Sequence, residues 1–201
     1  MRPLLVVMLK EPRPGRVKTR LGREIGLTGS AWWFRHQTRS LLMRLRDPRW
    51  QIVLAVAPDA EGLTSRVWPA DLPRIPQGAG DLGDRMGRIF RQLGRGPLCI
   101  IGADIPGISR PRIARAFRAL GRADTVFGPA PDGGYWLIGM ARRQPLPNTI
   151  LQGVRWSSQH ALSDSIASLP AGRTATIDVL QDVDTVTDLH EMGRDARPRA
   201  W

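Results

Sequence analysis

The strongest constraint on the fold of this 201-residue chain is a set of short, continuously apolar runs that alternate with segments of helical period. Residues 3–9, 50–57 and 97–102 read PLLVVML, WQIVLAVA and PLCIIG. Such runs are typical of strands buried on both faces of a sheet. A helical pattern over 25–46 separates the first two runs and stops before Pro48. Strands that alternate with helices predict a three-layer α/β/α sandwich around a mostly parallel, mixed sheet.

The remaining elements are predicted to be shorter. We expect strands over 72–77, 124–127, 135–140 and 175–179. Side-chain caps predict helices over 81–93, from 109 onward and over 157–169, and a capping-box pattern over 185–188 predicts a final helix. The sequence contains no internal repeat and no linker, so we predict one domain over 1–201 with its core over 3–192 and a tail over 193–201.

The composition limits where the protein can reside and which partners it can bind. No apolar segment approaches the roughly 20 residues that cross a bilayer, so we expect a cytoplasmic protein without a membrane span. Cys99 is the only cysteine and lies in an apolar run, which excludes a disulfide within the chain. The net charge of +12 favours an anionic partner: nucleic acid, a membrane surface or a phosphorylated ligand. Since the arginines are scattered rather than gathered in a basic run with interleaved aromatics, we do not expect nucleic-acid binding.

The loop after the first apolar run is the first candidate site. Only Lys10 and Lys18 are lysines in a chain that otherwise uses arginine, and both lie in this loop. Together with Thr19 and Arg20 they can surround a diphosphate or triphosphate with hydrogen-bond donors. The spacing is not that of a P-loop. An ordinary solvated basic loop is the alternative interpretation.

A glycine-rich segment, QGAGDLGDRM over 77–86, is the second candidate site. Its glycines allow a ligand to approach the backbone closely at Gly78, and the side chains of Gln77 or Asp81 can bind a base or a ribose. Asp81 is equally well explained as the N-cap of a helix.

Carboxylates follow three of the predicted strands. Asp104 stands at the end of a buried strand, where it can hold a divalent cation or form a turn. Asp132 lies in GPAPDGGYW over 128–136, beside Tyr135 and Trp136, which either line an acceptor pocket or belong to a hairpin and the core. Asp182 and Asp184 alternate with apolar residues and can point to one side, or they begin a helix.

Taken in chain order, these motifs resemble the DUF2064 family of GT-A-like nucleotide-diphospho-sugar transferases, often labelled arsenosugar biosynthesis glycosyltransferases. The motifs are KxPxPGxVKTRL, QGxGDLGxRM, GxDxP, GPxxDGGY and DVDTxxDL, and the likeness covers residues 5–189. The resemblance implies a Rossmann-like GT-A fold related to cofactor nucleotidyltransferases, with Asp104 and Asp184 as ligands of Mg²⁺ or Mn²⁺. Two departures from related enzymes leave the reaction type open: the first loop lacks a Gly-Gly-x-x-x-Arg pattern, and Asp104 is not part of an Asp-x-Asp pair.

The leading hypothesis is therefore metal-dependent glycosyl transfer from a nucleoside diphosphate sugar to a small acceptor. Asp132 is the candidate base, and Tyr135, Trp136 and Trp156 are the candidate acceptor-binding residues. Nucleotidyl transfer from a nucleoside triphosphate to a phosphorylated acceptor, with release of pyrophosphate, is the first alternative. A basic module without catalytic activity is the second. The oligomeric state stays open, with a homodimer compatible with the sequence.

Overall fold

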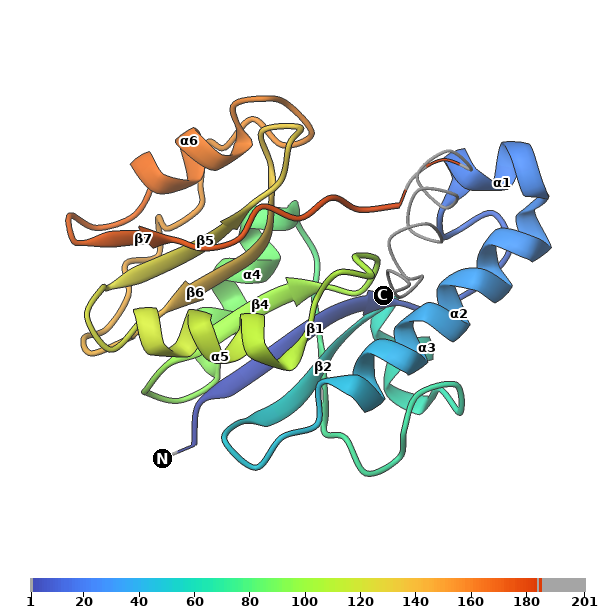
Figure 1. Ribbon diagram of the computed structural model, residues 1–201, viewed down its shortest axis with the longest axis horizontal. Helices are drawn as coiled ribbons and strands as arrows, with labels where there is room; N and C mark the ends of the chain where they lie inside the picture. Colours follow the sequence, from blue (N-terminus) through green and yellow to red (C-terminus); the bar gives the residue numbers. More distant parts are fainter. Residues whose placement is uncertain (1, 184, 186–201) are drawn as a thin grey trace, which may run out of the picture.

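The structure is a computed structural model that describes residues 2–183 and 185. Its centre is a seven-stranded sheet with the order β3-β2-β1-β4-β6-β5-β7 (Figure 1). The strands are β1 (Leu4–Lys10), β2 (Gln51–Ala57), β3 (Arg74–Pro76), β4 (Leu98–Gly102), β5 (Thr125–Pro129), β6 (Tyr135–Met140) and β7 (Thr174–Thr176). Every neighbouring pair is parallel except the two that include β6. The predicted mostly parallel, mixed sheet is confirmed.

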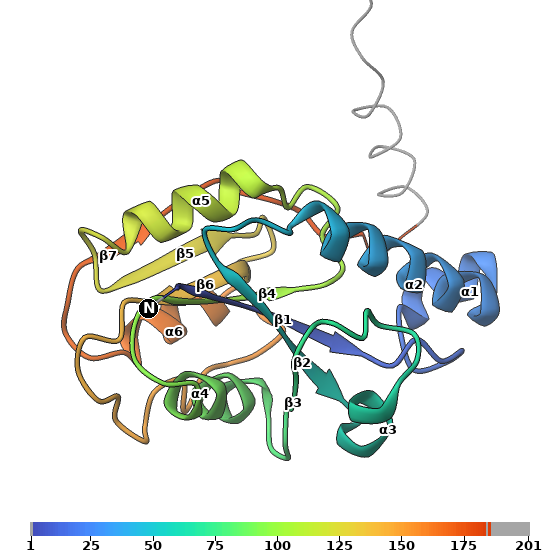
Figure 2. The ribbon, with the colours of Figure 1, turned by 90° about the horizontal axis from the view of Figure 1, so that it is seen from below.

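Helices lie on both faces of this sheet (Figure 2). One face is covered by α2 and α5, and the opposite face is covered by α4 and α6. The helices are α1 (Thr19–Ile25), α2 (Leu27–Arg44), α3 (Asp59–Thr64), α4 (Leu82–Gln92), α5 (Arg110–Ala119) and α6 (Ala161–Ala167). The three-layer α/β/α sandwich is thus the observed architecture. No described helix is both long and apolar enough to cross a membrane.

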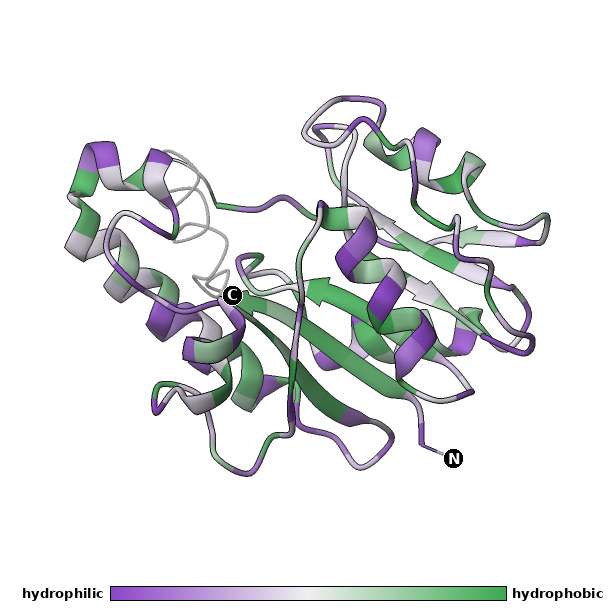
Figure 3. Cartoon of the chain, turned by 180° about the vertical axis from the view of Figure 1, so that it is seen from behind, coloured by the Kyte–Doolittle hydropathy of each residue, from purple (hydrophilic) through white to green (hydrophobic). Residues whose placement is uncertain are grey.

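Successive side chains of β1 point to opposite faces of the sheet, so β1 contributes to a hydrophobic core on each face. Leu5, Val7 and Leu9 pack with the face that carries Leu41 of α2. Val6, between them, packs with Ile89 of α4 on the other face. Both sets are almost completely buried, and the central strands are apolar along their length (Figure 3). Each such aliphatic side chain contributes about 1.5–3 kcal/mol by leaving water, so a strand buried on both faces holds both helical layers.

The predicted helix over 25–46 is wrong at its start. The chain forms two helices, α1 and α2, separated by Gly26 with φ of +83°. A residue with that backbone angle cannot continue a right-handed helix, and glycine adopts it without a Cβ clash. The short helices α1 and α3 were not predicted, because neither has enough residues to display a helical period.

The predicted helix over 157–169 is also wrong at its start. Ser157 has φ of 57°, and Ser158 forms a local turn by donating to the carbonyl of Arg155 and accepting from the amide of His160. Serine competes with helical hydrogen bonds in this way, so α6 begins only at Ala161. The predicted strand over 175–179 is observed as Thr174–Thr176. Of the capping-box pattern over 185–188 that predicts a final helix, only Thr185 is among the described residues.

The sheet has two functionally different edges. The carboxyl ends of β1, β2, β4 and β5 share one edge, because these strands point the same way, and β6 begins at that edge. In open α/β sheets this carboxyl edge is where ligands bind. The opposite, amino edge carries the segments that precede β4 and follow β6.

Candidate functional site

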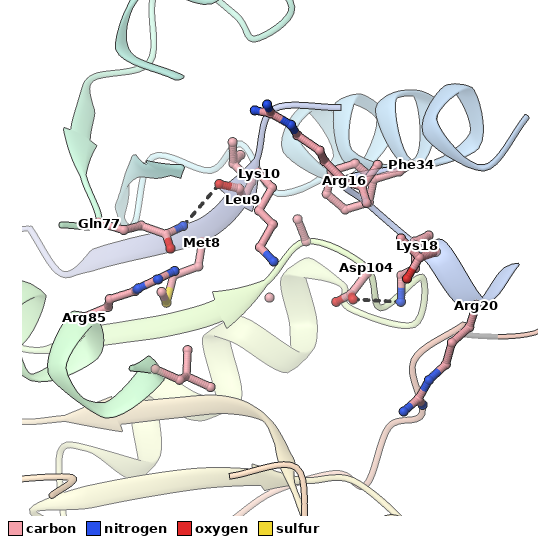
Figure 4. Close-up of a pocket in the computed structure, with 15 residues that line it drawn as sticks. Met8, Leu9, Lys10, Arg16, Lys18, Arg20, Phe34, Gln77, Arg85 and Asp104 are labelled. Carbon is pink, nitrogen blue, oxygen red and sulfur yellow. Dashed lines mark hydrogen bonds and ion pairs between the residues drawn. The ribbon is translucent and has the colours of Figure 1, made fainter. Parts of the chain in front are cut away.

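A cavity of about 550 Å³ opens at the carboxyl edge of the sheet (Figure 4). We call it the basic cavity. It is bounded by the end of β1, the loop and helix start over 16–20, the start of α4 and the residues that follow β4. Its lining residues are Met8, Leu9, Lys10, Arg16, Val17, Lys18, Thr19, Arg20, Phe34, Gln77, Leu82, Arg85, Gly102, Ala103 and Asp104. The structure therefore brings the first loop, Gln77 and Asp104 together.

The charge of the lining residues is strongly unequal. Five of them are cationic, and Asp104 is the one carboxylate among the described residues of the wall. Lys10 points its ammonium into the space between β1 and Asp104 (Figure 4). The five cations are Lys10, Arg16, Lys18, Arg20 and Arg85. A concave wall with this excess of positive charge attracts polyanions such as diphosphates.

Lys18 is the most constrained of these cations. Its backbone is left-handed, with φ of 44° and ψ of 49°, at the residue that precedes α1. Its side chain is only 6% exposed, and its Nζ lies 2.8 Å from Asp104 Oδ2 and 3.7 Å from Asp182 Oδ2. Residues held in sparsely populated backbone regions tend to gather at functional sites. The conformation of Lys18 places its ammonium between two carboxylates that are 78 residues apart in the sequence.

 Asp104 and Asp182 thus approach one cation from two distant parts of the chain.

Gln77 and the glycine-rich segment are anchored by the sheet and by α4. Gln77 is 3% exposed, and its Nε2 donates to the carbonyls of Leu9 at 3.2 Å and Ala55 at 2.8 Å. Arg88 donates to the carbonyl oxygens of Gln77 and Ala79. The Gln77 amide group therefore fixes the wall of the basic cavity, and its predicted contact with a base or ribose stays a prediction.

Gly78 belongs to a neighbouring space. It lines an adjoining cavity of about 520 Å³ that shares Lys10, Arg16 and Arg85 with the basic cavity. Its backbone is left-handed, with φ of +77°, and its amide donates to Asp59 Oδ1 at 3.2 Å. The two cavities therefore adjoin along three cationic side chains.

Asp81 is the N-cap of α4. Its Oδ1 accepts from the amide of Asp84 at 2.9 Å, and Asp84 Oδ2 accepts from the amide of Asp81 at 3.1 Å. This reciprocal pair is a capping box, the alternative that the sequence left open. Asp81 is absent from the described walls of the basic cavity and its neighbour. Its role toward a nucleotide remains a prediction without support from this geometry.

A smaller cavity of about 220 Å³ adjoins the basic cavity, and the two share Leu82, Gly102 and Asp104. We call it the aromatic cavity. It holds three carboxylates, Asp104, Asp132 and Asp182, together with aromatic side chains from β6 and from the segment before α6. The shared wall places a ligand of one cavity directly beside a ligand of the other.

Asp132 stands in the hairpin between β5 and β6. Its Oδ1 accepts from the amide of Gly134 at 2.9 Å, so one oxygen completes the turn. The residue is exposed and lines the aromatic cavity. The hairpin and the cavity wall, which the sequence treated as alternatives, are both present. A role of Asp132 as a base stays a prediction.

The three predicted aromatic residues have different surroundings. Trp136 is 2% exposed, its indole Nε1 donates to the carbonyl of Asp178 at 2.8 Å, and its ring packs so tightly on Gly128 that a Cβ there would meet it at 2.4 Å. This environment favours the core interpretation for Trp136. Trp156 is half-buried, and its Nε1 has no hydrogen-bond partner among the described residues. Trp156 is thus the better placed of the two for a polar ligand.

Tyr135 joins the core to the cavity. Its ring contacts Trp156 edge to face, with 6.4 Å between the ring centroids, and its hydroxyl lies 3.1 Å from Ser165 Oγ. Burial raises the pKa of Tyr135 well above its ordinary value, so the hydroxyl is protonated at neutral pH. The side chain is positioned as a neutral wall of the aromatic cavity.

Arg16, Arg85 and Asp182 were not assigned roles from the sequence. Arg85 lies one turn into α4, and its Nε donates to the carbonyl of Gly80 at 3.0 Å. The signal for Arg85 was its place in the glycine-rich motif, four residues after Asp81, which puts it on the same side of the helix start. For Asp182 the signal was its alternation with Asp184.

The carboxylates around Lys18 fit a divalent metal as a pair. Among residues 2–183 and 185, no three His, Cys, Asp or Glu side chains form a metal-binding group. Asp104 and Asp182 nevertheless share a cation, the Lys18 ammonium. Mg²⁺ is commonly held by one or two carboxylates together with substrate phosphates and water, so this pair fits such an ion. Asp184, the other predicted ligand, lies outside the described residues.

Comparison with known proteins gives the family. Residues 41–158 match the family described as "Uncharacterized protein conserved in bacteria (DUF2064)". The chain belongs to the DUF2064 family. No functionally curated protein matches the sequence. The resemblance inferred from the motifs is therefore confirmed at the level of the family.

Several solved structures have a fold similar to that of this chain. A protein from Desulfovibrio desulfuricans G20, provisionally described as a nucleotide-diphospho-sugar transferase, is 26% identical with a TM-score of 0.86, over 100% of this chain and 90% of that one. Rv0371c from Mycobacterium tuberculosis H37Rv, in complex with manganese, is 15% identical with a TM-score of 0.55, over 96% and 98% of the two chains. A CMP:2-keto-3-deoxy-manno-octonic acid synthetase complexed with CTP is 12% identical with a TM-score of 0.55, over 97% and 100%. These likenesses confirm the nucleotide-diphospho-sugar transferase fold and the expectation of a transferase.

Proposed function

We propose that this protein transfers a sugar from a nucleoside diphosphate sugar to a small acceptor, with Mg²⁺ or Mn²⁺ as its cofactor. The observation that carries the proposal is the pair of adjoining cavities, one basic and one acidic and aromatic, that share Asp104, Gly102 and Leu82. A transferase needs a donor and an acceptor in contact. The shared wall provides that contact.

The basic cavity suits the diphosphate of the donor. Charge-assisted bonds from ammonium and guanidinium groups are stronger than neutral hydrogen bonds, and the wall supplies them from Lys10, Arg16 and Arg85 as well as from Lys18. The same groups stabilise the negative charge that grows on the departing diphosphate as the glycosidic bond breaks. The neighbouring space beside Gly78 offers room for the nucleoside.

The metal would be held by Asp104 and Asp182, with Asp184 as a further candidate from the family resemblance. When bound, it supplies positive charge that neutralises the diphosphate oxygens. Lys18 already places a cation between these two carboxylates, so its ammonium competes with the metal for them. A bound diphosphate draws the ammonium away from the carboxylates, and this exchange makes metal and nucleotide binding mutually favourable.

The aromatic cavity suits the acceptor. Trp156 and Tyr135 provide apolar surface for a sugar or a similar small molecule. Asp132 has one oxygen held by the Gly134 amide, which orients the carboxylate. In the proposed reaction the other oxygen takes the proton of the acceptor hydroxyl while the new bond to the sugar forms.

A panel of ligands tests this proposal. The protein is heated with Mn²⁺ and each of several nucleoside diphosphate sugars and nucleoside triphosphates, and its unfolding temperature is measured. Selective stabilisation by a diphosphate sugar is expected, worth about 2.7 kcal/mol when the ligand is present at 100 times its Kd. Selective stabilisation by a triphosphate would instead support nucleotidyl transfer.

The same experiment includes matched variants. Lys10→Ala removes a cation from the basic cavity, whereas Arg23→Ala removes an exposed cation of α1 that does not line it. Stabilisation should fall only for Lys10→Ala. Equal loss in both variants, together with steeply salt-dependent binding to random oligonucleotides, would point to a non-catalytic basic module.

A further inference from the structure

A third cavity, of about 330 Å³, lies at the amino edge of the sheet and shares no lining residue with the basic or aromatic cavity. We call it the distal cavity. It is bounded by the end of α4, the loop that leads into β4 and the segment that follows β6. Its lining residues are Phe90, Arg91, Gly94, Arg95, Arg142, Gln144, Pro145 and Leu146.

Arg142 is the buried cation of this cavity. It is 6% exposed and has a positive φ of 48°. Its Nε donates to the carbonyl of Gly96 at 2.8 Å, and its Nη1 donates to those of Phe90 at 3.1 Å and Leu93 at 2.8 Å. Its Nη2 is buried and has no hydrogen-bond partner among the described residues.

The charge of Arg142 is not neutralised by a described carboxylate. Burial lowers its pKa to about 10, so the group is still charged at neutral pH. The carbonyl oxygens of Phe90 and Leu93 at the end of α4 partly stabilise it, because the carboxyl end of a helix is electronegative. A buried guanidinium is nevertheless costly without an anion beside it.

Two more arginines stand at the same cavity. Arg91 and Arg95 are exposed, and the ion pairs and hydrogen bonds of the described residues include neither side chain. Several other arginines are paired closely with aspartates, as Arg155 is with Asp164 at 2.8 Å and Arg143 with Asp124 at 2.9 Å. The distal cavity thus collects three guanidinium groups and no described carboxylate.

The other lining residues of the distal cavity and its volume indicate the size and polarity of a ligand. Phe90, Pro145 and Leu146 provide an apolar surface, and the volume lies at the lower end of the range for small-molecule sites. A dianionic phosphate matches several guanidinium groups better than a single carboxylate does. We propose that the distal cavity binds a small organic phosphate, with its phosphate on Arg91, Arg95 and Arg142 and its apolar part on Phe90 and Leu146.

The test uses ¹H–¹⁵N spectra of the full chain titrated with phenyl phosphate and, separately, with inorganic phosphate. The amides of Gly94 and Gln144 report on the distal cavity, and those of Gly102 and Ala103 report on the basic cavity. Saturable shifts of Gly94 and Gln144 with phenyl phosphate are expected. Absence of saturable shifts at these two amides would overturn the proposal.

Matched double variants separate a site from general attraction to a basic protein. Arg91→Gln with Arg95→Gln should weaken the phenyl phosphate response of Gly94 at least tenfold and leave that of Gly102 unchanged. Arg23→Gln with Arg35→Gln removes the same charge from exposed positions on α1 and α2 and should have no such effect. An equal loss in both doubles means non-specific charge attraction and contradicts the proposal.

Arg142 is left unchanged in these variants because its hydrogen bonds hold the end of α4. Inorganic phosphate distinguishes the two parts of the ligand. It should bind more weakly than phenyl phosphate, since it makes no contact with Phe90 and Leu146. Equal affinities would overturn the organic part of the proposal.

Discussion

The basic and aromatic cavities share a wall but are built by different means. The basic cavity is made at the ends of parallel strands, and its polar groups are fixed by the core, as Gln77 is through Leu9 and Ala55. The aromatic cavity depends on a hairpin, in which Asp132 is held by one amide two residues away. The comparison teaches that Gln77, on the proposed donor side, is fixed by contacts with residues distant in sequence, whereas Asp132, on the proposed acceptor side, is fixed by a local turn.

Asp104→Asn should have the largest effect, because Asp104 serves both cavities. We expect it to abolish metal-dependent nucleotide binding while leaving the fold intact, since the residue stands at an open strand end outside the core. Titration calorimetry with and without Mn²⁺ measures this, and circular dichroism checks the fold. Asp71→Asn, at an exposed site away from both cavities, is the matched control. Unchanged metal-dependent affinity would reduce Asp104 to a turn residue.

Asp132→Asn should separate the two cavities. If Asp132 is the base of the acceptor side, transfer slows by ~10²–10⁴-fold while donor and metal affinities stay nearly the same. Single-turnover rates and donor titrations, measured on the same preparation, give both quantities. Loss of donor binding would move Asp132 to the nucleotide side and remove the proposed division between the cavities.

Lys18→Ala should act in opposite directions on nucleotide and metal. Loss of a charge-assisted bond, worth ~1.5–3 kcal/mol, weakens nucleoside diphosphates by about 10–100-fold but hardly affects the nucleoside. Without nucleotide, Mn²⁺ binding should tighten, because no ammonium competes for Asp104 and Asp182. Calorimetry with Mn²⁺ alone provides the second measurement. Equal losses for nucleoside and nucleotide would mean that Lys18 supports only the fold.

Asp81→Ala should have the smallest effect on ligands. Removal of this N-cap lowers the free energy of unfolding by ~0.5–2 kcal/mol, measured by urea denaturation. Nucleotide affinity should change less than twofold at a temperature where the variant is folded. A tenfold loss of affinity would show that Asp81 contacts the nucleotide directly, and the wall of the basic cavity would then extend past the start of α4.

The sequence predicted the central strands, because short continuous apolar runs are typical of strands buried on both faces of a sheet. It did not predict the break at Gly26, since a glycine is tolerated inside a helix and only its observed φ of +83° ends one. The core position of Trp136 also depended on tertiary packing, through Gly128 and the carbonyl of Asp178. The approach of Asp182 to Lys18 joins distant segments, and no local pattern carries that information.

The antiparallel direction of β6 has a consequence for how this protein can diversify. Because β6 begins at the carboxyl edge, the hairpin over 130–134 closes one side of the aromatic cavity without crossing any other strand. Lengthening such a loop costs little, about 0.6 kcal/mol for each doubling. The hairpin can therefore be replaced to change which acceptor the aromatic cavity binds, while the strand ends that form the basic cavity stay the same.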